Sequence, residues 1–300
     1  MNKASFILAA SRFGLFAILF FVCGGVVISQ EAAEKAYKAE KAEKAFKAEH
    51  KNKEFCSNNN WSNGDKVSVT DLREMTIPAS GTLNIDGGRN GGVKVKGENR
   101  SDVLLRACVQ AWGVTDEAAR GILSSIRIGS GGVVKAEGPE ENGWSVSYEA
   151  RVPRNSNLKL TAHNGGIAIS SVDGKMEFET TNGGVSLMDV AGDVQGRTTN
   201  GGVNVALVGN TWKGAGLNVE TTNGGVNLMM PENYAANIET GTVNGGFKSD
   251  ISALNITTED AKGGGANRSK EIKTAINGGG APIRVTTRNG GIRIGVSDRN

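Results

Sequence analysis

From about residue 66 onward, hydrophobic and polar residues alternate in short runs that are separated by Gly, Asn and Asp. Runs such as KVSVT, TLNID, GVKVKG and WSVSYEARVP have the period of two that is typical of β-strands between tight turns. The stretch TDEAARGILSSI differs, because it has Thr115 as a candidate N-cap and apolar residues at Ala118, Ile122 and Ile126. The pattern predicts a β region over residues 64–156 with one short helix that covers an end or a face of a sheet.

The tripeptide Asn-Gly-Gly recurs within this alternating pattern, with Asn at positions 90, 164, 182, 200, 223, 244, 277 and 289. The five positions from 164 to 244 are separated by 18, 18, 23 and 21 residues. Each repeat contains two alternating runs, as in MEFETT-NGG-VSLMDV, and a second turn signal lies about halfway along it. Two strands and two corners in roughly 20 residues predict one coil of a β-solenoid, with a meander of hairpins as the alternative.

The apolar positions of successive repeats match one another. If Met176 and Phe178 point inward before a corner, Val185 and Leu187 point inward after it. The equivalent positions of the following repeats are Val203, Val205, Leu217, Val219, Val226 and Leu228. Matching residues suit coils that stack in register about 4.8 Å apart, with ladders of the Thr residues that precede each corner. We therefore predict an all-β fold with a solenoid-like stack of two-strand rungs over residues 157–300.

The simplest interpretation of Asn-Gly-Gly is a corner, because Asn and Gly tolerate positive φ. A phosphate-binding loop would open a helix, whereas strand runs follow here. A calcium-binding β-roll would carry an Asp ligand in each turn. The predicted corner residues are Asn164, Gly165, Gly166, Asn182, Gly183, Gly184, Asn200, Gly201, Gly202, Asn223, Gly224, Gly225, Asn244, Gly245 and Gly246.

The N-terminal 55 residues lack the alternating pattern. Lys3 and Arg12 precede an apolar run over residues 13–22, and Ser29 offers a small residue for cleavage, which predicts an export signal over residues 1–29. An uncleaved membrane anchor and a lipidated Cys23 are the alternatives. Residues 30–55 are rich in Ala, Glu and Lys, with acids four residues before bases, which predicts a solvated helical spacer. A membrane-surface or partner-binding helix is the alternative for this spacer. Every interpretation places the remaining chain outside the cytoplasm.

Composition adds two constraints. The chain has 43 glycines in 300 residues, about twice the usual share, as repeated turns require. The formal net charge of +3 gives no reason to expect a nucleic-acid partner. Cys56 and Cys108 could pair in an oxidising compartment, but the sequence leaves this open and slightly favours two free thiols.

A catalytic site is hard to assemble from this sequence. His163 with Asp173 or Glu177 would form a base and its orienting group, but no nucleophile accompanies them. The common hydrolase, zinc and phosphate-loop motifs are absent from the sequence. Enzymes that act on polysaccharides can work with acids and bases alone, for which the candidates are Asp189, Asp193 and Arg197. We predict no catalytic site, no cofactor and no metal.

The C-terminal part is basic, since residues 262–300 contain eight Lys and Arg residues and two acids. On stacked strands, Arg284 and Arg293 would form a basic stripe. Together with Arg288 they are candidates for contact with a polyanion or with lipid head groups. The alternative is that these charges protect the unpaired edge of the last rung from end-to-end stacking.

Three stretches carry a family resemblance: IPASGTLNIDGGRNGGVKVKG, GWSVSYEARVPRNSNLKLTAHNGGIAISSVDGKMEFETTNGGVSL and RTTNGGVNVALVG. They closely resemble the bacterial β-strand-repeat family of unknown function DUF4097, whose members are described as putative adhesins. The resemblance covers roughly residues 75–247. It implies an exported or envelope-associated β-repeat protein without enzymatic activity, and it supplies no catalytic residues to carry over.

These observations predict an exported structural or adhesin-like module of the cell envelope, located in the periplasm, on the cell surface or outside the cell. Its partner would be an envelope polymer or another envelope protein, and the membrane would be involved only through an uncleaved N-terminal segment. One alternative is an envelope-stress or signalling module that a partner protein recognises. A polysaccharide-active β-helix enzyme is the third possibility.

Overall fold

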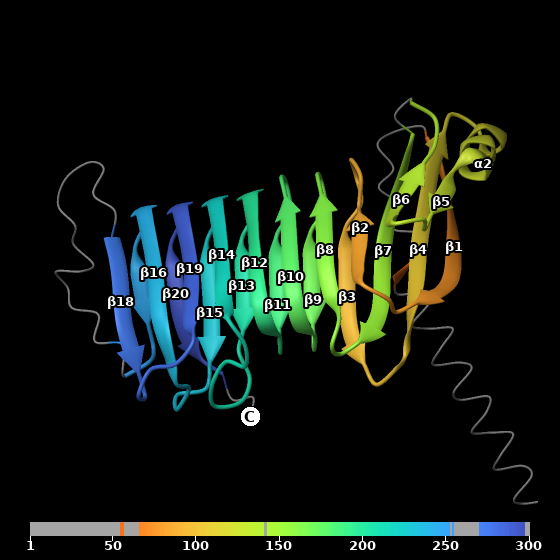
Figure 1. Ribbon diagram of the computed structural model, residues 1–300. Helices are drawn as coiled ribbons and strands as arrows, with labels where there is room; N and C mark the ends of the chain where they lie inside the picture. Colours follow the sequence, from red (N-terminus) through yellow and green to blue (C-terminus); the bar gives the residue numbers. More distant parts are fainter. Residues whose placement is uncertain (1–54, 57–65, 141–142, 253, 255–269, 298–300) are drawn as a thin grey trace, which may run out of the picture. The chain divides into compact units, whose positions relative to one another are not determined.

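The computed structural model describes residues 55–56, 66–140, 143–252, 254 and 270–297 (Figure 1). The chain divides after Glu54, and every described residue belongs to the part from Phe55 to Asn300. Strands predominate among these residues, and helix α2 (Asp116–Ser125) lies among them. The predicted all-β class is therefore confirmed. The predicted signal segment, residues 1–29, and the predicted spacer, residues 30–55, lie outside the described residues except for Phe55.

The strands form two sheets (Figure 1), with the main hydrophobic core between them and a small second cluster of Val69, Ala111 and Ala119 at helix α2. Sheet A contains, in spatial order, β1 (Val67–Pro78), β4 (Asp102–Gly113), β7 (Trp144–Pro153), β3 (Val93–Glu98), β9 (Ile167–Ser170), β11 (Val185–Met188), β13 (Val203–Ala206), β15 (Val226–Met230), β20 (Ile292–Val296) and β17 (Phe247–Ser249). Sheet B contains, in spatial order, β18 (Lys270–Ile276), β16 (Ala236–Asn244), β19 (Pro282–Asn289), β14 (Gly216–Asn223), β12 (Ala191–Asn200), β10 (Asp173–Thr180), β8 (Asn157–Ala162), β2 (Thr82–Asp86), β6 (Val133–Glu137) and β5 (Arg127–Gly129).

Each rung consists of one strand in sheet B, a corner and one strand in sheet A. Neighbouring rungs pair parallel and in register, so that β10 pairs with β12 and β11 pairs with β13. Met176 lies opposite Val194, and Val185 lies opposite Val203. This arrangement is the predicted solenoid-like stack, and the two sheets do not close into a barrel.

The spatial order of the rungs differs from their order in the chain. The rung formed by β19 and β20 lies between the β14–β15 rung and the β16–β17 rung. β18 then pairs antiparallel with β16 at the edge of sheet B. The physical reason is that every rung has the same alternation of inward and outward residues. A later rung can therefore pair with an earlier one in the same register.

The core contains the residues that the alternation predicts to point inward. Met176, Phe178, Val185 and Leu187 are all buried, and so are the equivalent residues of the next rungs: Val203, Val205, Leu217, Val219, Val226 and Leu228. One position departs from the apolar pattern, because Gly196 lies beside Phe178 in β12. A Cβ at Gly196 would lie 2.1 Å from the Phe178 ring. The glycine thus makes room for the one large ring in this layer of the core.

The region from β1 to β7 shares both sheets with the repeats that follow. β2 pairs with β8, and β3 pairs with β9, so β2 and β3 form a rung that continues the stack. The predicted boundary between residues 156 and 157 is therefore a change in sequence pattern within one compact unit. Helix α2 has Thr115 as its N-cap, as predicted, and packs on β1 and β4. Its buried residue is Ala119, whereas Ala118 is exposed.

Cys56 and Cys108 form a disulfide, with a Cα–Cα distance of 5.3 Å. The sequence had slightly favoured two free thiols, and this expectation was wrong. Cys108 lies on the outer face of β4, a position that only the folded sheet brings next to residue 56. The bond therefore attaches the start of the β part to a strand that is paired on both sides, by β1 and by β7.

We expect the substitution Cys108→Ser to lower the free energy of unfolding by about 2–4 kcal/mol, because the bond closes a long loop in the unfolded chain. The two cysteines are 52 residues apart. Urea unfolding followed by circular dichroism measures the change. Wild-type protein in reductant serves as the control and should match the variant. Equal stability of the variant and the oxidised wild type would contradict the pairing.

Candidate functional site

The corner asparagines form one continuous ladder of side-chain hydrogen bonds. Asn182 Nδ2 donates to Asn164 Oδ1, and Asn200 Nδ2 donates to Asn182 Oδ1, both over 2.8 Å. The ladder runs in the spatial order Asn90, Asn164, Asn182, Asn200, Asn223, Asn289 and Asn244. The asparagine of each rung is therefore joined to the next through its own amide. This use of the side chain was missed in the sequence, where Asn was assigned to backbone conformation alone.

The first glycine of each corner is needed for close approach of the backbone. A Cβ on Gly183 would lie 2.1 Å from the carbonyl oxygen of Gly165, and one on Gly201 would lie 2.1 Å from that of Gly183. The predicted reason, positive φ, was wrong for these corners, because none of their residues is among the positive-φ residues of the structure. The equivalent close contacts occur at Gly165, Gly224, Gly245 and Gly290, whereas a Cβ on Gly91 would meet the carbonyl oxygen of Val146. The second corner glycines, Gly166, Gly184, Gly202, Gly225 and Gly246, have more room, at 3.0 Å or beyond.

At five corners, a buried threonine of the neighbouring rung donates a hydrogen bond to a corner carbonyl. Thr198 Oγ1 donates to the carbonyl oxygen of Gly183 over 2.7 Å, and Thr221 Oγ1 donates to that of Gly201 over the same distance. The equivalent donors are Thr180, Thr242 and Thr287. The predicted Thr ladder is therefore a set of hydroxyl-to-backbone bonds, in which each hydroxyl satisfies a carbonyl of the neighbouring rung.

One Asn-Gly-Gly copy is not a rung corner. Asn277, Gly278 and Gly279 link β18 to β19, and all three have positive φ. The Asn277 side chain donates to the carbonyl oxygens of Glu232 and Tyr234, each over 2.9 Å. The same tripeptide thus serves two backbone conformations, and its flanking strands decide which one it adopts.

The three basic candidates lie on different surfaces. Arg284 is on β19 in sheet B, where its Nε lies 3.8 Å from Glu239 Oε1. Arg293 is on β20 in sheet A, where its Nη2 bonds Asp250 over 2.8 Å. Arg288 is exposed beside the corner residue Asn289. The predicted stripe of Arg284 and Arg293 does not form, because the corner between them turns the chain from one sheet to the other. Neither residue protects an edge, since β16 and β17 flank this rung.

The residues weighed for catalysis are not brought together. His163 lies at the corner end of its rung and Asp173 at the start of β10, roughly 25 Å apart at about 3.3 Å per residue. Glu177 is roughly 13 Å from His163 by the same measure. Arg197 Nη2 bonds Glu179 over 2.8 Å. The acids Asp189 and Asp193 accept hydrogen bonds from Ser171 and Gln195, respectively.

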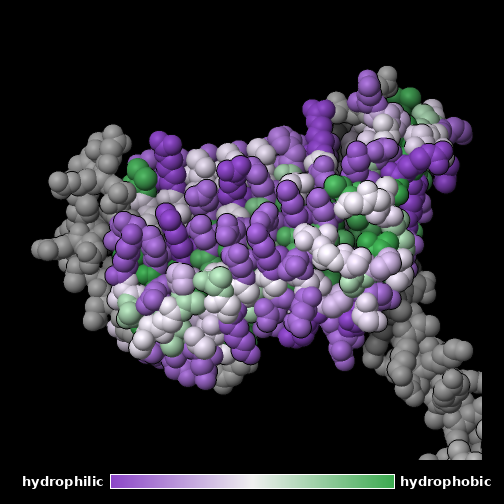
Figure 2. Space-filling view, viewed as in Figure 1, coloured by the Kyte–Doolittle hydropathy of each residue, from purple (hydrophilic) through white to green (hydrophobic). Residues whose placement is uncertain are grey.

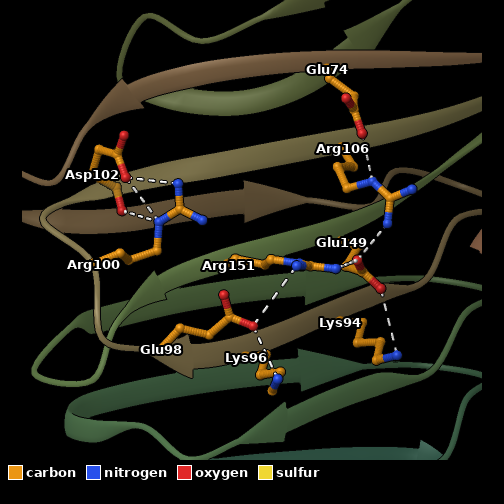
Figure 3. Close-up of polar contacts among 9 residues, drawn as sticks. All are labelled: Glu74, Lys94, Lys96, Glu98, Arg100, Asp102, Arg106, Glu149 and Arg151. Carbon is orange, nitrogen blue, oxygen red and sulfur yellow. Dashed lines mark hydrogen bonds and ion pairs between the residues drawn. The ribbon is translucent and has the colours of Figure 1, made fainter. Parts of the chain in front are cut away.

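A charged cluster on the outer face of sheet A was not predicted (Figure 3). Arg106 on β4 is 2 % exposed, and its guanidinium bonds Glu149 over 2.7 Å and Glu74 over 2.8 Å. Lys94 and Arg151 lie 3.5 Å and 3.7 Å from the carboxylate of Glu149. The alternation in β4 indicates the face on which Arg106 lies, but only the pairing of β4 with β1 and β7 brings its partners to it.

Two further features define this cluster. The Phe55 ring lies against the guanidinium, with 5.2 Å from Arg106 Cζ to the ring centroid. Burial alone would raise the pKa of Glu149, but the hydrogen bond from Arg106 and the charges of Arg106, Lys94 and Arg151 outweigh it. The pKa of Glu149 is therefore lowered from its ordinary value of 4.5. The cluster thus holds Glu149 ionised at neutral pH.

Two absences apply to the residues that the structure describes. Over that part of the chain, no three His, Cys, Asp or Glu side chains are placed to hold a metal ion. The same residues include no helix with the length and hydropathy needed to span a bilayer. Hydrophilic side chains cover most of the surface in view in Figure 2.

The fold and its corners define a class: a β-repeat protein whose parallel rungs stack in register without closing into a barrel. The comparison with family models then matched residues 26–295 to "Toastrack DUF4097". The chain belongs to the DUF4097 (Toastrack) family, and the resemblance drawn from its repeats is confirmed. A comparison with curated proteins found no match.

Three solved structures are similar to this chain at low identity. The "putative cell adhesion protein" of Clostridium sporogenes has 10% identity and a TM-score of 0.36, covering 77% of this chain and 100% of its own. The "putative lipid binding protein" of Parabacteroides distasonis has 11% identity and a TM-score of 0.30, covering 79% and 98%. The "putative adhesin" of Bacteroides fragilis has 10% identity and a TM-score of 0.29, covering 76% and 97%.

The corner contacts predict opposite outcomes for two adjacent glycines. Gly201→Ala should lower the free energy of unfolding by about 3 kcal/mol, because its Cβ would meet the backbone of the next rung. Gly202→Ala should change it by less than about 1 kcal/mol, because the nearest atom would be 3.4 Å away. Urea unfolding of the two variants measures this difference. Equal losses of unfolding free energy in the two variants would show that the close backbone contact at Gly201 does not exclude a Cβ there.

The charged cluster predicts a pH-dependent loss of stability. A carboxyl group whose pKa is lowered by folding contributes stability above its unfolded pKa and loses it as the pH falls through the folded pKa, so the contribution of Glu149 should begin to fall near pH 4.5 and be lost at lower pH. At pH 7, Glu149→Gln should cost about 3–5 kcal/mol, because the buried Arg106 loses its buried charged partner and keeps Glu74, which is partly exposed. Glu74→Gln, at the exposed end of the cluster, should cost less than about 1 kcal/mol.

Unfolding curves between pH 3 and pH 7 check both statements. The difference in the free energy of unfolding between the wild type and Glu149→Gln should become smaller as the pH falls. A difference that stays constant over this range would exclude ionised Glu149 as its source.

Proposed function

We propose that this protein is an exported, adhesin-like structural module of the cell envelope and that it has no catalytic activity. It would act through its surface, by contact with an envelope polymer or with another envelope protein. The membrane would be involved only through an uncleaved N-terminal segment.

Two features support export. The N-terminal sequence has a charged start followed by an apolar run, as secretory signals do. The Cys56–Cys108 disulfide fits an oxidising compartment, because such bonds are rare in proteins that remain in the reducing cytosol. The two features are independent of each other, and both support a location of the β part outside the cytoplasm.

The observation that carries an adhesive role is the in-register repetition of outward-facing side chains. Each rung places equivalent residues one strand spacing, about 4.8 Å, from those of the next rung. A surface of this kind offers many weak and similar contacts to a repetitive partner, and linked weak contacts add up to strong attachment. The absence of catalytic activity is supported by the separation of His163 from Asp173 and by the pairing of Arg197 with Glu179.

We expect the purified protein to co-sediment with the insoluble envelope fraction of the cells that produce it. The bound fraction should rise with the amount of envelope and saturate. Protein unfolded by reduction and urea, then diluted into the same assay, is the control for trapping in the pellet. If folded and unfolded protein sediment equally, or if neither does, the adhesive role is wrong.

A further inference from the structure

The outer face of sheet A carries two rows of small, uncharged side chains across β9, β11, β13 and β15. One row runs through Ala168, Ser186, Asn204 and Asn227, and strand pairing places each of these opposite the next. The other row runs through Ser170, Met188, Ala206 and Met229. We call these eight residues the neutral face. Charged residues occur only at its two ends, with Lys94 and Lys96 on β3 and with Arg293 on β20.

The opposite outer face, on sheet B, has a different character. Its rows across the same rungs include Lys159, Glu177, Glu179, Arg197 and Glu220. Arg197 forms an ion pair with Glu179 on the neighbouring strand, and Glu177 forms one with Lys175 on its own strand. The strands β9, β11, β13 and β15 contain no charged residue at all. The charges of these rungs are thus confined to one side of the stack.

The polar groups of the neutral face have unused hydrogen-bonding capacity. Within the part of the chain that the structure describes, the side chains of Ser186, Asn204 and Asn227 have no hydrogen-bond partner in the protein. Ser186 and Asn204 are exposed, and Met188 is 38% exposed. At the end of the second row, the Met229 side chain lies against Gly295, where a Cβ would be 2.8 Å from the Met229 sulfur. The face therefore combines free hydroxyl and amide groups with the apolar side chains of Met188 and Met229.

The size of the neutral face limits its partner. From β9 to β15 there are three strand spacings, or about 14 Å at 4.8 Å each, which is about 19 Å with half a spacing on either side, and the two rows are roughly 12 Å wide with their side chains. The strip thus measures about 230 Å². A stable protein–protein interface needs about 800 Å² from each partner, so a folded protein or a second copy would require contacts well beyond it. A single extended polymer chain fits a strip of this width.

We propose that the neutral face binds an extended, uncharged polysaccharide that crosses the strands of sheet A. Its hydroxyl groups would bond Ser186, Asn204 and Asn227, and the non-polar faces of its sugar rings would lie on Met188 and Met229. An uncharged polymer matches this face because neither side has to give up the hydration of a charge on binding. This proposal rests on the adhesive function proposed above and names the surface and the partner for it.

The test uses Asn204→Glu, at the centre of the neutral face, and Asn218→Glu as the matched control. Asn218 is an exposed asparagine on β14, in the outer face of sheet B. Both substitutions add the same charge to an exposed strand position, and equal thermal unfolding temperatures would show that both variants fold. The probes are insoluble cellulose and insoluble chitin, which are neutral and extended, and soluble polygalacturonate, which is acidic.

We expect the wild type to be retained on cellulose or on chitin, Asn204→Glu to lose at least tenfold in affinity, and Asn218→Glu to stay within twofold of the wild type. Equal retention of Asn204→Glu and wild type would overturn the assignment of the face. Binding to polygalacturonate alone would contradict the proposal that the partner is uncharged. A dimer in solution that Asn204→Glu disrupts, without binding to either insoluble glycan, would assign the face to a second copy of the chain.

Envelope co-sedimentation separates this inference from the proposed function. If Asn204→Glu sediments with the envelope as the wild type does, the adhesive role stands and the neutral face is not its surface. If the wild type fails to sediment with the envelope but is retained on chitin or cellulose, the face binds glycan and the envelope role is wrong.

Discussion

The structure depends on how closely the backbones of successive corners approach one another. The first glycine of one corner lies so near the carbonyl of the next that a Cβ would be about 2 Å from it, as at Gly183 and Gly201. This contact allows Asn182 and Asn200 to bond through their side chains, and it lets Thr198 reach the Gly183 carbonyl. Neighbouring corners are thereby joined by a hydrogen bond between asparagine side chains on the outside and by a hydrogen bond from a threonine hydroxyl on the inside. The register of the strands on both sides of the corner follows from these bonds.

A stack held in this way has interchangeable rungs. Every rung offers the same corner and the same inward residues to its neighbours, so its place is not determined by its position in the chain. The rung with Asn289 lies between those with Asn223 and Asn244 and donates and accepts in the same ladder as the others. The N-terminal end is individual by contrast. There the disulfide attaches Cys56 to β4, and the buried pair of Arg106 and Glu149 joins β4 to β7, which lie outside the repeats.

The two outer surfaces of the stack differ in chemistry although the same corners produce both. The strands before the corners in sheet B carry acids and bases that pair across neighbouring strands, as Glu179 and Arg197 do. The strands after the corners in sheet A carry Ala, Ser, Asn and Met instead. A partner that approaches the stack therefore meets either a charged surface or an uncharged one. In a protein built from similar rungs, charge is thus what distinguishes the two outer faces.

The sequence by itself determined the all-β class, the two-strand rung, the inward residues such as Val185 and Val203, and the helix that begins after Thr115. These features follow from local periodicity, which one strand or one helix expresses without its neighbours. Only the tertiary structure decided the order of the rungs, the partner of Cys56 and the burial of Arg106 beside Glu149. It also gave Asn182 and Gly183 their roles, and it separated Arg284 from Arg293. The reason is the same in each case. Alternation assigns a residue to a face, but which residues meet on that face depends on which strands pair.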